Sequence, residues 1–132
     1  MKEAGALGKI YQDGEVIIKQ GEMGTCMYVI QEGQVEVLLE DGEEQVRLAV
    51  RREGEFFGEM AIFEHEVRMA TVRALGKARV LTVDEKNFLR RVHKDPSLAY
   101  HLVQTMSKRI RELSVEVAQL KDQAGLEVTP QE

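Results

Sequence analysis

The sequence predicts a mostly β protein, a sandwich or a roll, followed by C-terminal helices. In the first part of the chain, glycines separate short segments in which apolar and polar residues alternate, as in half-buried strands. After Gly76 the next glycine is Gly125, and the apolar residues repeat at helical spacing instead. A chain of 132 residues fits one domain and can bury a core without disulfides or metals.

Short runs rich in β-branched residues mark the expected strands, which are residues 16–18, 26–31, 33–39, 45–50, 70–74 and 78–83. Asp41-Gly42 is a hairpin signal between the third and fourth of these. We expect glycine turns at Gly33 and around Gly76-Lys77, because glycine adopts the positive φ angles that turns require. Residues 1 to about 7 are expected to form a frayed lead-in or a short helix.

Capping residues mark the helices in the second part of the chain. Asp84 can cap a short helix over residues 85 to about 92. Asp95 is placed as the N-cap, and Pro96 as the first residue, of a long helix that ends near residue 123. The predicted domains are therefore a β core over 1–94, a helix over 95–124 and a flexible tail over 125–132.

The long helix carries a heptad pattern. Its a positions are Val103, Ile110 and Val117, and its d positions are Met106, Leu113 and Leu120. β-Branched residues at a are typical of parallel two-stranded coiled coils, so we expect a homodimer through this helix. Glu116 and Lys121 occupy g and e positions, where an ion pair between chains can favour one register. The alternative is that the stripe packs on its own β domain.

Composition disfavours several classes of partner and compartment, although it leaves a local basic patch possible. The net charge of −5 disfavours a nucleic-acid surface, which is usually basic. Cys26 is the single cysteine, so no internal disulfide can form, and a reducing compartment, the cytoplasm, is expected. We expect no membrane association, because no apolar run could span a bilayer and the N-terminus lacks a signal-peptide core.

No catalytic pattern is visible. The three histidines, His65, His93 and His101, do not share a metal-ligand spacing, and no nucleophile lies in a recognisable pattern with a base. We therefore expect no enzyme activity, no metal and no cofactor.

Residues 54–74 carry the most informative motif. Gly58 permits a tight backbone at the end of a strand, and residues 59–63 can form one helical turn whose first N–H groups suit an anion. Arg68 follows on a loop and could bind the same anion with a forked contact. The Glu59 carboxylate is better suited to accept a hydrogen bond from a sugar hydroxyl. Together these groups indicate a ribose-phosphate site.

This stretch resembles the phosphate-binding cassette of the cyclic-nucleotide-binding domain family, which includes catabolite-activator-type regulators and cyclic-nucleotide-dependent kinases. The matching residues are Phe57-Gly58-Glu59-Met60-Ala61, then Arg68, and then Ala70-Thr71-Val72. A weaker likeness extends from about Tyr11 to Gln123. The resemblance implies a double-stranded β-helix, or jelly-roll, and a regulatory module that binds cAMP or cGMP and shifts its C-terminal helix.

The resemblance also implies a role for each matching residue. Glu59 would accept the ribose 2'-hydroxyl, and Arg68 would pair with the cyclic phosphate. Further donors to the phosphate would be the backbone amides of Gly58, Met60, Ala61 and Ala70. The long helix would reach the base through Leu113 and Ser114.

Two departures from the family pattern bear on the ligand. Met69 replaces the small or hydroxyl residue that usually follows the arginine, which removes one contact and adds bulk, and Val67 replaces a frequent proline. A dimer scaffold with a degenerate pocket therefore stays open as the alternative. Arg68 as a plain surface residue and Glu59 as a helix cap stay open as well. The sequence shows no helix-turn-helix after the long helix, so we expect no direct DNA binding, and the effector is not identified.

Overall fold

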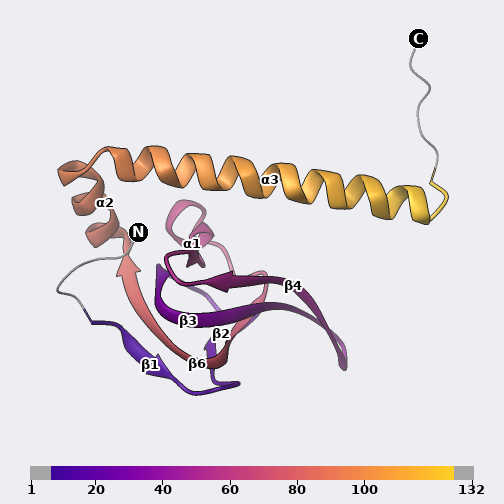
Figure 1. Cartoon of the computed structure of the whole chain (residues 1–132), viewed down its shortest axis with the longest axis horizontal. Coiled ribbons are helices and arrows are strands. Elements are labelled where there is room, and N and C mark those ends of the chain that lie inside the picture. The colour runs from indigo at the N-terminus through magenta and orange to yellow at the C-terminus, as the bar shows by residue number, and fades with distance from the viewer. Residues whose placement is uncertain (1–6, 127–132) are drawn as a thin grey trace, which may run out of the picture. The chain divides into compact units, whose positions relative to one another are not determined.

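The computed structural model describes residues 7–126. The chain forms two compact units, of which the first ends at Arg90 and the second begins at Arg91. The predicted boundary, after residue 94, lies beyond this point. The first unit contains a six-stranded antiparallel sheet and the short helix α1 (Figure 1).

The sheet is built around two long strands, β3 (Cys26–Asp41) and β6 (Thr71–Asp84), which pair with each other along most of their length. The shorter strands add to different parts of this pair. β1 (Lys9–Tyr11) and β2 (Val16–Ile18) pair with β6, whereas β4 (Glu44–Arg52) and β5 (Phe56–Phe57) pair with β3.

The core lies inside the curve of this sheet. Side chains from five strands form one apolar cluster, whose buried members are Tyr11, Ile18, Ile30, Val35, Phe57, Val72, Ala74, Ala78 and Val80. Residues far apart along β3 and β6 belong to the same cluster, so the sheet must curve around it. This arrangement agrees with the predicted roll.

The predicted turns at Gly33 and Gly76 are wrong. Both glycines have a positive φ, but β3 and β6 continue through them, with register irregularities between Ile30 and Gln34. A Cβ at Gly33 would collide with the Lys77 carbonyl oxygen, so the two strands approach closely where they bend. The glycines therefore serve bulges in two long strands rather than turns between four short ones. The hairpin at Gly42 is present as predicted.

The short helices lie close to their predicted positions. α1 spans Met60–Phe63, and Glu59 occupies its N-cap position. α2 spans Glu85–Lys94, and the Asp84 carboxylate accepts the Asn87 amide hydrogen at 2.8 Å, as expected of a cap.

The second unit consists mainly of α3, which spans Ser97–Gln123 without a break. Its N-cap position falls on Pro96 rather than on Asp95, although the Asp95 carboxylate still accepts the Ser97 amide hydrogen at 3.2 Å. The helix ends in a Schellman motif at Gly125, where Leu126 donates to the Lys121 carbonyl at 3.0 Å. Most of the predicted flexible tail lies outside the described residues.

A buried carboxylate ties three strands of the sheet together. Glu36 on β3 is 6% exposed and accepts hydrogen bonds from Arg73 Nε on β6 at 3.0 Å and from Arg47 Nη2 on β4 at 3.2 Å. Burial alone would raise the pKa of this carboxyl, but the two guanidinium groups outweigh burial, and the pKa lies below its ordinary value. Glu36 is therefore charged and paired at neutral pH.

We expect Glu36→Gln to lower the free energy of unfolding at pH 7 by about 1–2 kcal/mol, because charge-assisted hydrogen bonds are lost. A lowered pKa in the folded state means that this stabilisation is present above the pKa of the unfolded chain and is lost as the pH falls through the folded value. Urea unfolding should therefore be measured from pH 7 to pH 3. The free energies of unfolding of Glu36→Gln and of the unmodified chain should become equal at the acid end. Glu32→Gln is the matched control, because Glu32 is 67% exposed and lies 3.8 Å from Arg79. A constant difference across the pH range would contradict the assignment.

Candidate functional site

Arg68 is the centre of the candidate site. Its Nη1 donates to the Gly58 carbonyl at 2.8 Å, and its Nη2 donates to the Cys26 carbonyl at 2.8 Å. Among residues 7–126, no carboxylate pairs with this guanidinium. The two carbonyls fix the position of the positive charge without neutralising it, so the group can still bind an anion through its remaining N–H groups.

The surroundings of Arg68 fit its planar shape. Its Cζ lies 5.8 Å from the centre of the Tyr28 ring, which itself stacks on Phe57 at 5.2 Å. Burial raises the pKa of the Tyr28 hydroxyl, so the ring is a neutral phenol at any physiological pH. The Arg68 guanidinium thus lies near the stacked rings of Tyr28 and Phe57, and the Tyr28 hydroxyl adds no charge beside it.

Two glycines make room for the guanidinium. A Cβ on Gly24 would collide with Arg68 Nε, Cζ and Nη2. A Cβ on Gly58 would lie 3.0 Å from Arg68 Nη1 and 2.8 Å from Ile18 Cδ1, and Gly58 also has a φ of 74°. Any other residue at either position would therefore have to displace the arginine or its neighbours.

The backbone of Arg68 is fixed as well. Its amide donates to the Glu22 carbonyl at 2.8 Å, and its carbonyl accepts the Gly21 amide hydrogen at 2.9 Å. Met23 and Val67 form an antiparallel bridge beside these bonds. The loop that carries Arg68 is therefore held to the segment between β2 and β3, and the guanidinium is preorganised.

Glu59 lies directly after Gly58, whose carbonyl binds Arg68, and its side chain is buried. It makes no capping hydrogen bond to α1. The hydrogen bond from Arg68 to the Gly58 carbonyl brings the backbone next to Glu59 close to the guanidinium. That the Glu59 carboxylate and the Arg68 guanidinium enclose one ligand stays a prediction.

The other predicted cassette residues differ in exposure. Ala61 is buried and packs in the core, whereas Met60 is exposed, and the Ala61 amide is 3.4 Å from the Gly58 carbonyl, a long contact. Met69 is 72% exposed. Ala70 is half-buried just before β6 begins.

Comparison with known families decides the family of this chain. The cyclic nucleotide-binding domain family matches residues 9–95, which include every strand of the sheet and the whole cassette.

The chain belongs to the cyclic nucleotide-binding domain family.

Individual relatives agree with this assignment. A protein of Rhodopseudomonas palustris named as a candidate potassium channel is 38% identical over 87% of this chain and 28% of its own length. A cAMP-dependent protein kinase regulatory subunit of Blastocladiella emersonii is 36% identical over 67% of this chain and 23% of its own length. The chain therefore spans less than a third of either relative.

A solved structure shows the same fold. The catabolite activator protein of Thermus thermophilus superposes with a TM-score of 0.76 at 27% identity, over 86% of this chain and 54% of that protein. The predicted family, the β-roll with C-terminal helices and the predicted class of function, a regulatory cyclic nucleotide-binding domain, are confirmed by these similarities.

Leu113 and Ser114, which were predicted to reach the base, belong to the second unit. Leu113 is 58% exposed on α3, and the Ser114 hydroxyl donates to the Ile110 carbonyl of its own helix at 2.9 Å. Their predicted contact with the base of a cyclic nucleotide stays a prediction.

The sequence analysis missed three contributors to this cyclic nucleotide-binding domain. These are Gly24, the Cys26 carbonyl and the ring of Tyr28, all near the start of β3. The glycine spacing Gly21 to Gly24 was part of the family resemblance, but nothing local connects it with an arginine more than forty positions later.

Within the described ranges, no group of three or more His, Cys, Asp or Glu side chains could hold a metal ion. In that part of the chain, every helix is too short or too polar to span a bilayer.

Proposed function

We propose that this chain binds a 3',5'-cyclic nucleotide, cAMP or cGMP, at the cassette of residues 54–74. One observation carries the proposal: Arg68 is half-buried, rigidly held by two carbonyls and without a carboxylate partner among the described residues. A cyclic phosphate carries one negative charge, which matches one uncompensated guanidinium. The backbone bonds of Arg68 reduce the entropy that is lost when the ligand binds.

The remaining polar contacts follow the family pattern. Glu59 is proposed to accept the ribose 2'-hydroxyl, since its buried carboxylate adjoins Gly58. The amides of Gly58, Met60, Ala61 and Ala70 are proposed as further donors to the phosphate. Met69 offers no hydroxyl at its position, so discrimination between cAMP and cGMP must depend on other contacts.

The direct test is calorimetry of the full chain with cAMP, cGMP and a cyclic dinucleotide. Linear 5'-AMP is the matched control, because it has the same base and sugar but an open, more highly charged phosphate. We expect saturable binding of at least one cyclic mononucleotide and much weaker binding of 5'-AMP. The absence of heat for every cyclic nucleotide at submillimolar concentration would favour a scaffold with a degenerate pocket.

A regulatory output requires contact between the cassette and the helices. Within the first unit, Phe63 at the end of α1 packs edge-on against the buried Phe88 of α2, with ring centres 5.7 Å apart. His65 Nε2 also lies 3.6 Å from the Glu85 carboxylate at the start of α2. A ligand that favours one cassette conformation would thereby favour one position of α2, and the change would continue along the chain into α3.

We further propose that α3 forms a homodimer. Its a and d residues form an exposed apolar stripe, in which Val103, Ile110 and Leu113 are each more than half exposed. Such a stripe on a helix of 27 residues is typical of a coiled-coil seam. The expected compartment remains the cytoplasm, and the acidic net charge favours a protein effector over nucleic acid.

We expect Leu113→Asp to weaken the dimer by roughly 100-fold or more, because a carboxylate at a d position must be desolvated in the seam. Val115→Asp is the matched control, since Val115 is a similarly exposed apolar residue at an f position, outside the seam. Sedimentation velocity over a range of concentrations measures the dimer dissociation constants of both variants. A Leu113→Asp dimer as strong as that of the unmodified chain would show that the stripe serves another contact.

A further inference from the structure

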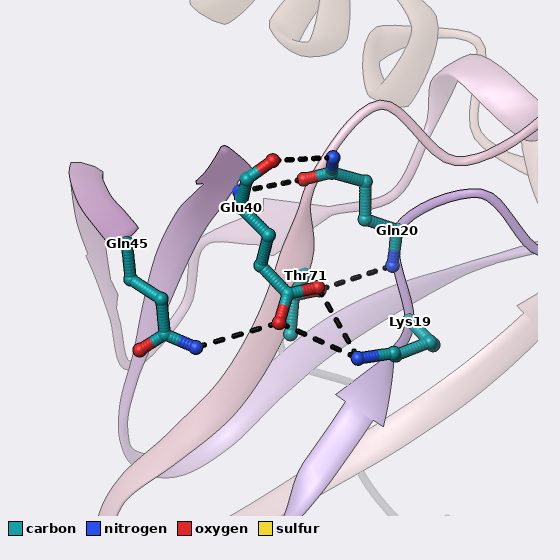
Figure 2. Close-up of polar contacts among 5 residues, drawn as sticks. All are labelled: Lys19, Gln20, Glu40, Gln45 and Thr71. Carbon is teal, nitrogen blue, oxygen red and sulfur yellow. Dashed lines mark hydrogen bonds and ion pairs between the residues drawn. The ribbon is translucent and has the colours of Figure 1, made fainter. Parts of the chain in front are cut away.

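We propose that Glu40 is a positioning residue for the nucleotide-binding arginine, an inference that rests on the proposed function. Glu40 lies near the end of β3, and Thr71 begins β6 at the edge of the cassette. A network of polar contacts around Glu40 joins these strands to the segment that follows β2 (Figure 2).

The Glu40 carboxylate accepts hydrogen bonds from three side chains. The Thr71 hydroxyl donates to it at 2.7 Å, Lys19 Nζ at 3.2 Å and Gln45 Nε2 at 3.4 Å (Figure 2). The hydrogen bond from Thr71 and the neighbouring Lys19 hold the pKa of this carboxyl below its ordinary value. Glu40 is therefore ionised at neutral pH, which strengthens its hydrogen bonds.

Gln20 is held to the same strand by its side chain. Its Nε2 donates to the Glu40 carbonyl at 3.0 Å, and its Oε1 accepts the Glu40 amide hydrogen at 2.8 Å (Figure 2). The Gln20 amide donates to the Thr71 hydroxyl at 3.0 Å. The position of Gln20 is thus fixed both by β3 and by the first residue of β6.

The next residues connect this network to the arginine. Gly21 donates to the Arg68 carbonyl, Glu22 accepts the Arg68 amide hydrogen, and Gly24 lies against the guanidinium. The segment from Lys19 to Gly24 is therefore held by Glu40 at one end and by Arg68 at the other. Thr71 itself follows Arg68 by three positions, so the network fixes the cassette loop from both sides.

The Thr71 hydroxyl serves this network and not the ligand. Thr71 is 2% exposed, and its hydroxyl both donates to Glu40 and accepts from Gln20. A threonine within a phosphate-binding motif would ordinarily be assigned to the phosphate. Here its contacts make it part of the support for Arg68.

The test compares variants of this 132-residue chain in cAMP affinity and in the NMR signal of the Arg68 Nε–H group. Glu40→Gln keeps the shape of the side chain but removes its charge, and Thr71→Val removes the hydroxyl. Thr71→Ser restores the hydroxyl and should rescue the defect. Glu43→Gln is the matched control, because Glu43 is an exposed carboxylate in the adjoining hairpin.

We expect Glu40→Gln and Thr71→Val to weaken cAMP binding by about 10-fold, measured at a temperature at which every variant is folded. Both should shift or broaden the Arg68 signal, whereas Thr71→Ser and Glu43→Gln should leave affinity and signal unchanged. Affinity equal to that of the unmodified chain in Glu40→Gln overturns the proposal, even if the melting temperature falls.

The outcome also separates this inference from the proposed function. If the unmodified chain binds neither cAMP nor cGMP, the proposed function fails, and the Arg68 signal alone decides whether Glu40 positions the guanidinium. If the chain binds cAMP and Glu40→Gln binds it equally well, the proposed function stands and the positioning role falls.

Discussion

Replacement of Arg68 with lysine is expected to weaken cAMP binding by roughly 100-fold or more, although the positive charge is kept. The guanidinium donates to the Gly58 and Cys26 carbonyls from two different nitrogens and has further N–H groups for a phosphate. A single ammonium group cannot reach both carbonyls and the phosphate with the same geometry. Arg68→Ala should lower the cAMP affinity at least as much. Calorimetry measures the cAMP affinity of both variants.

The Arg68 variants also carry a cost in stability that must be separated from the loss of affinity. Removal of the guanidinium leaves two carbonyls without their donor, which should lower the free energy of unfolding by about 1–2 kcal/mol. Arg73→Ala is the matched control, because Arg73 lies on β6 and pairs with the Glu36 carboxylate instead. It should be similarly destabilised but keep its affinity. Equal affinity in Arg68→Lys and the unmodified chain would remove Arg68 from the site.

The sequence contained enough information to predict most of the helices and strands and to single out two candidate site residues, although the short strands β1 and β5 were not predicted. α2 and α3 begin where Asp84 and Asp95 predict, within one residue, because capping is a local interaction. Glu59 and Arg68 could be singled out because they lie in one continuous motif. In each case the deciding residues are close together in the chain.

What could not be predicted depends on long-range contacts. A glycine with a positive φ serves a turn or a bulge equally well, so Gly33 did not reveal that β3 continues through it. The partners of Thr71 are separated from it by 51 positions for Gln20 and 31 for Glu40. The pairing of β3 with β6 brings Glu40 close to Thr71, and the pairing of β2 with β6 brings Gln20 close to it. No local pattern encodes either register.

Gly24→Ala is the second change with a large expected effect. The new Cβ would occupy the position of the Arg68 guanidinium. Because the guanidinium is the end of a flexible side chain, it can move away from the new Cβ, but it then leaves the Gly58 and Cys26 carbonyls. We expect roughly 100-fold weaker cAMP binding with a loss of stability of about 1–2 kcal/mol, as for the Arg68 variants, because the same two carbonyls lose their donor.

Gly14→Ala is the matched control. Gly14 has a φ of 80° and open space around its Cα, so an added Cβ is strained by the backbone but touches nothing. It should cost about 1–2 kcal/mol of stability and leave cAMP affinity unchanged. Calorimetry and thermal unfolding of both variants would then show similar losses of stability, with a loss of cAMP affinity in Gly24→Ala alone. If Gly24→Ala instead lost stability and kept its affinity, the guanidinium would not need its present position to bind the phosphate, and the role of Gly24 would be confined to packing.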